Sequence, residues 1–310
     1  MNAISTTPLA HVDATPIAAD VDIAGISSRA MLVNATVRVL TGKKRDRRMT
    51  DEVCQTNGAQ HNAVRVYKSL FGEAIRPVQA AEAAVREAVH ARTLCWGEDG
   101  TRILKGSAYL DFTRAMVPAV AAFEGAVAGF IAGYPDVIEG ARGRLGRAFN
   151  EADFPAQDRL RERFEVKVTY FPVPSGDDFR VSLTAHEAEA IRRSTEEAVR
   201  GGMEEAVKNL LDRMQGPVQR MATRLRIYGR GEDGKVVHPF RDTLVENVRE
   251  MIALVPGLNL MDDPAIAHLC EEMASSLAVH EAEDLRQSPG LRETVADRAD
   301  DILRRMQGIY

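Results

Sequence analysis

The chain has 310 residues, of which 45% are hydrophobic and 27% are charged, proportions typical of a soluble globular protein with one large or two modest domains. Aromatic residues make up only 5%, which argues against a β-sandwich and against a platform of several rings for stacking single-stranded bases. The net charge of −5 makes the whole protein a poor non-specific binder of polyanions, so any such binding has to be local.

The first ordered element is predicted to be a strand that ends in a basic loop. Residues 1–29 are rich in Ala, Thr, Ser, Asp and Pro without a sustained period, and we expect a flexible tail there. Apolar and polar side chains alternate over residues 31–41, which predicts a half-buried strand. The strand leads into the basic run Thr41-Gly-Lys-Lys-Arg-Asp-Arg-Arg48, interpreted as a loop, and a short helical or irregular stretch begins at Thr50.

The basic loop is the surface of this sequence that best suits a polyanion. Its cations would create a strong local positive potential, and each phosphate they neutralise would release counterions. Three interpretations stay open: the loop contacts nucleic acid, it docks an acidic protein or subunit, or it is a solvated turn. The candidate residues for binding a polyanion or a partner are Arg38, Lys43, Lys44, Arg45, Arg47 and Arg48.

Helices are predicted next, over residues 77–95, 109–133 and 135–150. The middle one contains an apolar stretch, residues 116–134, that is about long enough to span a membrane. Glu124 lies in its centre, at a cost of roughly 2.5–3.5 kcal/mol for insertion, so we expect a buried helix kinked at Pro118 instead. In the last of the three, glycines at three-residue steps favour close helix approach, and Arg142, Arg144 and Arg147 either extend the basic surface or form a solvated face.

A second β signal covers residues 164–183. Residues 164–171 and 179–183 alternate, and a Pro- and Gly-containing turn lies between them, which predicts a hairpin. Together with the strand at 31–41 it would form a small three-stranded antiparallel sheet.

The rest of the chain is predicted to be helical. Thr184 and Glu187 form a capping box at the start of a long amphipathic helix, with weak points expected at Gly201-Gly202 and Gly216-Pro217. Shorter helices are expected to begin near Pro239, Pro264 and Pro289, and Asp263 and Ser288 are ready N-caps for the latter two.

No catalytic or cofactor signature is present in this sequence. The cluster His268, Cys270, Glu271 and Glu272, with His280, lacks the spacing of a metal motif, and no Walker or Rossmann fingerprint occurs. Cys95 beside Trp96 is more typical of a buried thiol than of a nucleophile. We therefore expect no catalytic residues, no metal and no cofactor. An odd count of three cysteines and an N-terminus without a signal-peptide pattern favour a reducing compartment and a cytoplasmic location.

Several packing and turn motifs resemble those of a family of uncharacterised phage and bacterial proteins, a domain of unknown function often encoded beside MoxR-type AAA+ ATPases. The resemblance covers about residues 31–270 and implies a non-catalytic component that acts beside an AAA+ machine in the cytoplasm of a bacterial host cell. The motifs are Gly42-Lys-Lys44, the Ala-rich helix pair around 112–134, Leu145-Gly-Arg-Ala-Phe149, Phe154-Pro155, Arg163-Phe164, Phe171-Pro-Val-Pro174 and Gly257-Leu-Asn-Leu-Met-Asp-Asp-Pro264.

These patterns predict an α+β protein that is predominantly α-helical, a long helical bundle or hairpin carrying a small antiparallel sheet. We divide it into a tail (1–29), an α+β region (30–183) and a helical region (184–310). The leading hypothesis is a non-enzymatic adaptor or self-assembling structural protein without a membrane role, whose partner is a second copy or a protein such as an AAA+ ATPase. The alternative is a nucleic-acid-binding protein, single-strand binding or annealing, that uses the basic loop 38–48.

Overall fold

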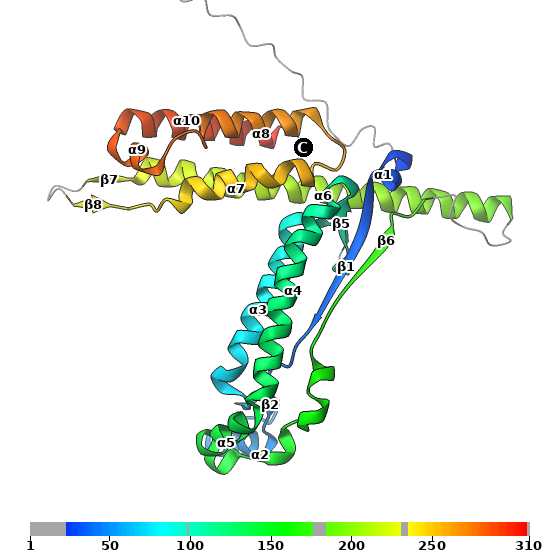
Figure 1. Ribbon diagram of the computed structural model, residues 1–310, viewed down its shortest axis with the longest axis vertical. Coiled ribbons are helices and arrows are strands. Elements are labelled where there is room, and N and C mark those ends of the chain that lie inside the picture. The colour runs from blue at the N-terminus through cyan, green and yellow to red at the C-terminus, as the bar shows by residue number, and fades with distance from the viewer. Residues whose placement is uncertain (1–22, 98, 176–183, 231–234, 309–310) are drawn as a thin grey trace, which may run out of the picture. The chain divides into compact units, whose positions relative to one another are not determined.

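A computed structural model describes residues 23–97, 99–175, 184–230 and 235–308 (Figure 1). The protein is α+β and mainly helical, with a small antiparallel sheet, which confirms the predicted fold class. Residues 1–22 of the expected tail lie outside the described residues, and its last residues form α1 (Ile23–Arg29).

The chain folds into two compact units, each assembled from separate segments. Unit 1 contains residues 1–32, 93–107 and 171–310, and unit 2 contains residues 33–92 and 108–170. The strands β1 (Ala30–Arg38) and β6 (Glu165–Pro172) each belong partly to both units.

The main sheet has the strand order β4-β5-β1-β6. The strands β4 (Leu94–Cys95) and β5 (Arg102–Lys105) pair antiparallel, with Leu94 opposite Ile103. This sheet corrects the predicted three-stranded one: β4 and β5 were not expected, and the predicted strand at 179–183 lies outside the described residues. The helix expected to reach Cys95 ends at Arg92, because the guanidinium groups of Arg102 and Arg213 donate to the carbonyl of Thr93 (2.7 and 3.0 Å) and hold the chain in the sheet.

Unit 2 is built on two long helices, α3 (Arg76–Arg92) and α4 (Tyr109–Ala132). Val78, Val85 and Val89 bury one face of α3. At one end of the pair follow α5 (Tyr134–Leu145) and an edge-to-face cluster of aromatic rings. The cluster contains Phe71, Phe130, Tyr134, Phe154 and Phe164. Short 3₁₀ turns occupy Gly72–Ile75, Gly106–Ala108, Gly146–Ala148, Glu151–Asp153, Gln157–Arg159 and Arg161–Arg163.

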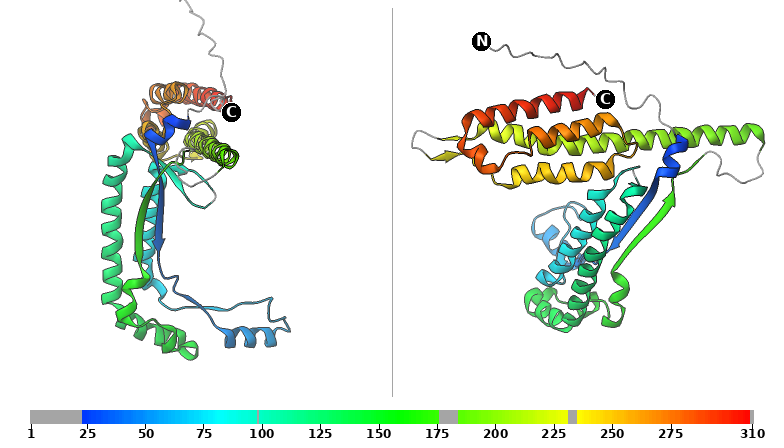
Figure 2. Two further views of the ribbon diagram at one scale, coloured as in Figure 1. Left: turned by 90° about the vertical axis from the view of Figure 1, so that its right-hand side faces the viewer. Right: turned by 45° about the horizontal axis from the view of Figure 1, so that its top comes forward.

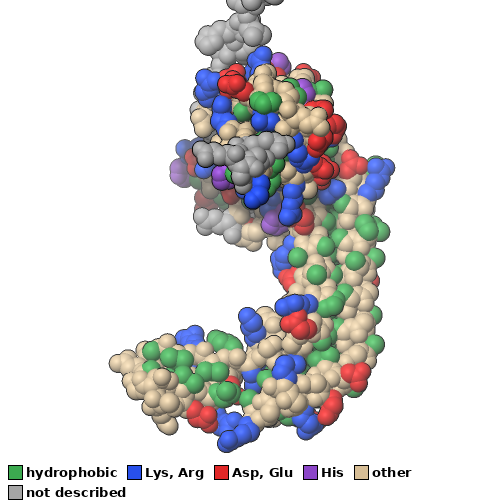
Figure 3. All heavy atoms as spheres, turned by 90° about the vertical axis from the view of Figure 1, so that its left-hand side faces the viewer, with side chains coloured by type: hydrophobic (Ala, Val, Ile, Leu, Met, Phe, Trp, Pro, Cys, Tyr) green, Lys and Arg blue, Asp and Glu red, His purple; other side chains and the backbone are tan. Residues whose placement is uncertain are grey.

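Helix α4 is more exposed than the sequence indicated. It buries residues such as Phe112 and Phe123 but presents an apolar outer face, with Leu110 64% and Val117 63% exposed. Figure 3 shows apolar side chains along the surface of the α3–α4 pair. The stretch Gly106–Ala132 is long and apolar enough to cross a membrane, judged by length and composition alone, and only 22% of its most apolar part is buried. The expectation of a buried helix was therefore wrong for this face, because a pair of helices covers only one side of each.

An arm of unit 2 carries the basic run. It consists of β2 (Lys43–Arg45), α2 (Arg47–Thr56) and β3 (Tyr67–Ser69), with β2 and β3 paired antiparallel. Figure 2 shows this arm extending from the end of the α3–α4 pair.

Unit 1 is a bundle around α6 (Ala185–Ile227), which runs without interruption through both expected weak points. Gly202 and Pro217 are buried there, so tertiary packing stabilises the helix where its local propensity is low. Helices α7 (Thr243–Leu258) and α10 (Pro289–Gln307) pack against α6, and α8 (Pro264–Ser276) packs against α7 and α10 (Figure 2). The short helix α9 (Ala282–Gln287) and the ribbon of β7 (Gly229–Arg230) and β8 (Val236–Val237) complete it.

The predicted helix caps agree well with the structure. Thr184 and Glu187 form the capping box of α6, Asp263 accepts from the backbone amide of Ala265 (2.7 Å) and Ser288 accepts from that of Leu291 (3.3 Å). The helix expected near Pro239 begins at Thr243, and α9 was not predicted.

Candidate polyanion-binding surface

The basic run forms a strand and the start of a helix where a loop was expected. Lys43–Arg45 pairs with a strand more than twenty residues further along the chain, and this non-local pairing leaves no local signal in the run itself. The turn before it requires Gly42, whose φ is +62° and where a Cβ would lie 2.8 Å from the ring of Phe71. After it, the carboxylate of Asp46 accepts from the amide of Met49 (3.0 Å) and caps α2.

The strand register divides the charged side chains between two faces of the ribbon. Lys44 lies opposite Lys68 in one cross-strand pair, and the flanking pairs are Lys43 with Ser69 and Arg45 with Tyr67. Because side chains alternate along a strand, Lys44 and Lys68 share one face, here called the inner face. Lys43, Arg45, Tyr67 and Ser69 share the opposite one, called the outer face.

The inner face is a buried ionic network. The ammonium group of Lys68 forms an ion pair with Asp153, lies 3.4 Å from Asp46 and donates to the carbonyl of Ala148 (3.0 Å). Lys44 forms a second ion pair with Asp153 (2.9 Å). The side chains of Lys68, Asp46 and Asp153 are each less than one-tenth exposed, so this network holds the arm to the rest of unit 2.

The charged groups of the network stabilise one another's ionised forms. The amide of Met49 is the main reason why the pKa of Asp46 is lowered, and Lys68 adds to the effect. Burial opposes the charged forms of Asp153 and Lys68, but their hydrogen bonds outweigh it, so the pKa of Asp153 is lowered and that of Lys68 is raised. All of these groups are therefore charged at neutral pH.

The outer face carries cations that no acidic group neutralises. Lys43 and Arg45 of this face, and Arg47 at the start of α2, are exposed, and among the described residues their side chains have no ion pair or hydrogen bond. The same holds for Arg65, which precedes β3. Tyr67 lies directly opposite Arg45 and is 55% exposed. Unpaired cations attract phosphates, and an exposed aromatic ring between them can stack a base.

The other predicted binding residues are engaged within the protein. Arg38 forms an ion pair with Glu165 (3.1 Å). Arg48 lies 3.8 Å from Glu52 and donates to the carbonyl of Arg147 (3.0 Å). The structure thus separates the predicted set into three cations with internal partners, Arg38, Lys44 and Arg48, and three without, Lys43, Arg45 and Arg47.

The start of α2 adds to the positive potential. Arg47 and Arg48 lie in the first turn of the helix, where the macrodipole is positive and where acidic residues are normally favoured. This placement costs stability, and the carboxylate of Asp46 that caps the helix is buried and shared with Lys68.

The end of α5 lies against the ribbon. Arg144 donates to the carbonyl groups of Leu70 (2.8 Å) and Ser69 (3.1 Å), so it fixes β3 in place. Arg142 pairs with Glu139 and stacks over Phe149. Gly140 and Gly143 of α5, and Gly146 just after it, serve no close helix approach, since a Cβ at any of them would meet nothing within 4 Å.

Sequence reasoning missed Arg65 and Tyr67, although a signal was present. Val64 and Val66 alternate with Arg65 and Tyr67, which is the two-residue period of a strand with one covered face. The polar stretch before this segment, residues 55–62, made it resemble a loop.

The charges are unevenly divided between the units. Unit 2 contains 19 lysines and arginines against 15 aspartates and glutamates, whereas unit 1 contains 21 against 30. Figure 3 shows Lys and Arg side chains gathered at the end of unit 2 that carries α2 and α5, with acidic side chains among them. The net negative charge of the chain therefore belongs to unit 1.

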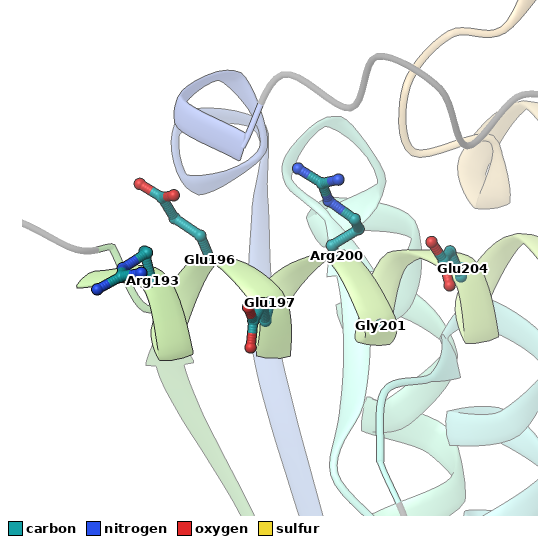
Figure 4. Close-up of a pocket in the computed structure, with 6 residues that line it drawn as sticks. All are labelled: Arg193, Glu196, Glu197, Arg200, Gly201 and Glu204. Atoms are coloured by element: carbon teal, nitrogen blue, oxygen red, sulfur yellow. The ribbon is translucent and has the colours of Figure 1, made fainter. Parts of the chain in front are cut away.

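Other candidate sites show no convergent chemistry. The described residues contain no group of three or more His, Cys, Asp or Glu side chains that could hold a metal ion. The thiol of Cys95 accepts from the guanidinium of Arg102 (3.5 Å). A hollow of about 330 Å³ along α6 is lined by Arg193, Glu196, Glu197, Arg200, Gly201 and Glu204, whose side chains point in different directions (Figure 4).

No protein-family model, curated protein or solved structure matches this chain. The resemblance to the phage and bacterial family stays a prediction.

Proposed function

We propose that this protein is a non-enzymatic nucleic-acid-binding protein that holds single strands on the outer face of the β2–β3 ribbon. One observation carries the proposal: the exposed ring of Tyr67 lies opposite Arg45 on a face whose cations have no partner among the described residues. Two further cations lie near this pair in sequence and register, Lys43 along β2 and Arg65 before β3.

Single strands suit this face better than a duplex. A base stacked on an aromatic ring contributes about 1–3 kcal/mol to binding without regard to sequence, and only an unpaired base can reach the ring. The phosphates on either side of that base would meet Lys43, Arg45 and Arg65, with counterion release as the driving force.

The test is fluorescence anisotropy with labelled single- and double-stranded DNA across a salt series. Tyr67→Ala should weaken single-strand binding by about tenfold, the lower part of the stacking range, and Tyr67→Phe should restore it. Lys43→Gln with Arg45→Gln should weaken binding further and flatten its dependence on salt.

Lys44→Gln is the matched control, because Lys44 is the sequence neighbour of both cations but lies on the inner face. It should leave the affinity almost unchanged. Equal losses for Lys44 and for its neighbours, or binding that ignores salt, would contradict the proposal.

A second candidate function is self-assembly through α4, favoured by its exposed apolar face. Besides Leu110 and Val117, this face contains the small residues Ala121, Gly125 and Ala128, which allow a second helix to approach closely. A second copy of the chain is the proposed occupant, since two such faces would cover each other.

Light scattering of the purified chain tests this second candidate. Val117→Lys should shift an oligomer toward the monomer, whereas Val236→Lys, at an exposed valine of unit 1, should not. If the wild type is a monomer at all concentrations, self-assembly is rejected. The apolar face of α4 would then be a binding surface for another protein, such as the AAA+ ATPase that the resemblance implies.

A further inference from the structure

A groove of about 500 Å³ lies beside the ribbon in unit 2, here called the exit groove. It is lined by the chain segment 37–41 that leaves β1, by Lys43, and by Gln79, Glu82 and Arg86 of α3. Its volume is within the range of ligand sites, about 300–1,000 Å³, and it is open, so a chain can run through it.

The walls of the exit groove are held in place by Arg86. Its guanidinium donates to the carbonyl of Val37 (3.2 Å) and to the carboxylate of Glu82 (2.8 Å). This bond joins α3 to the strand across the groove. The carboxylate of Glu82 is thereby neutralised, and Arg38 is paired with Glu165. Lys43 is the charge facing the groove without a partner among the described residues, and it leaves the groove positive.

Lys43 belongs to the outer face and to the exit groove at once. Next to it, Val39 and Leu40 are half-buried and offer an apolar surface between the cations. An alternation of apolar contact and positive charge suits the alternating bases and phosphates of a nucleic-acid strand.

We infer that a single strand stacked on Tyr67 continues past Lys43 into the exit groove, so that the site holds several consecutive nucleotides. This inference rests on the proposed function. It adds Gln79 and the segment 37–41 to the binding surface and sets a minimum length for the ligand.

The experiment compares oligothymidylates of about 4 and about 12 nucleotides, lengths within the range of single-strand binding sites. The wild type should bind the longer oligonucleotide more tightly than expected from the larger number of positions at which a short site could bind along it. Gln79→Glu places a carboxylate in the groove, and it should weaken binding of the longer oligonucleotide about tenfold, because like charges brought together at an interface are costly. Binding of the shorter one should be unchanged by Gln79→Glu and should still depend on Tyr67.

Gln79→Glu should not harm folding, because the residue is exposed in the first turn of α3, where the helix dipole favours an acidic side chain. Gln219→Glu, the same change on an exposed position of α6, is the matched control and should alter neither affinity. If Gln79→Glu binds the longer oligonucleotide as the wild type does, while Tyr67→Ala still weakens both, the exit groove is not used and the proposed function stands. If neither oligonucleotide binds with a dependence on salt and on Tyr67, the proposed function fails, and the inference fails with it.

Discussion

Gly202 lies in α6 directly against the indole ring of Trp96, the single tryptophan of the chain. A Cβ at this position would lie 2.8 Å from the ring, whereas a Cβ at the neighbouring Gly201 would meet nothing within 4 Å. Gly202→Ala should therefore lower the free energy of unfolding by about 1–3 kcal/mol through overpacking. Gly201→Ala should raise it by about 0.5–1 kcal/mol, because alanine favours the helix.

Urea unfolding followed by Trp96 fluorescence measures both glycine variants. Only Gly202→Ala should also alter the emission of the folded state, since it alone displaces the ring. Equal effects of the two substitutions would mean that Trp96 does not pack on α6.

Lys68 is the residue on which the ionic network of the arm depends. Lys68→Met would leave two buried carboxylates, those of Asp46 and Asp153, with fewer partners. Removing one member of a buried pair typically costs about 3–5 kcal/mol, so we expect a loss of that size in urea unfolding monitored by circular dichroism. Lys43→Met, on the exposed outer face, should change stability by no more than about 0.5 kcal/mol.

The same network predicts how the stability of the arm depends on pH. The lowered pKa values of Asp46 and Asp153 contribute stability that is fully present above their ordinary pKa of 3.8 and is lost as the pH falls through the folded-state values. The raised pKa of Lys68 contributes stability that is present below its ordinary pKa of 10.5 and is lost as the pH rises through the folded-state value. The protection of the arm's amides against hydrogen exchange, expressed relative to the intrinsic exchange rate at each pH, should therefore fall at acid pH, and Lys68→Met should show a smaller fall. An identical acid response in both proteins would exclude the network as the cause.

The N-terminal caps of α6 and α10 precede helix segments that differ in burial. The capping box of α6 precedes a segment, residues 185–198, in which no residue is buried, whereas α10 packs Val295 and Ala296 into the core. Thr184→Ala removes about 1 kcal/mol of helix stabilisation but should only increase fraying of that segment. Ser288→Ala should lower the free energy of global unfolding by a similar amount.

Hydrogen exchange distinguishes these two responses. Thr184→Ala should accelerate exchange in residues 186–198 without moving the global unfolding midpoint. A shift of the midpoint as large as that of Ser288→Ala would show that the start of α6 is coupled to the core.

Helix α6 and strand β4 show which structural features can be predicted from residues close together in the sequence and which cannot. The start of α6 was predictable because a capping box is a contact between residues three apart. The continuity of α6 through Gly202 was not, because the compensating contact comes from Trp96, about a hundred residues earlier. Likewise β4, a strand of two residues, carries no period, and it forms because Arg102 and Arg213 bind the carbonyl of Thr93.

For the whole molecule, the division of charge decides how salt affects binding. If Lys43, Arg45, Arg47 and Arg65 each neutralise one phosphate, the logarithm of affinity should fall with the logarithm of salt concentration with a slope of about −3, at about 0.7 per phosphate of a single strand. The anisotropy titration measures this slope directly. A slope near zero would mean that the acidic unit 1 governs the electrostatics of the chain, and a slope steeper than about −6 would require many more cations than the outer face provides.

The sequence alone determined the class of this protein and most of its helices, because helical periodicity and caps are relations between residues a few positions apart. It also located the basic run. Only the tertiary structure decided which of those cations are available, since that depends on the register of β2 against β3 and on acidic partners such as Asp153, about a hundred residues away. It likewise brought Tyr67 opposite Arg45 and left one face of α4 uncovered. A non-local pairing and the exposure of a surface are properties of chain segments that meet only in the folded protein, so no local pattern records them.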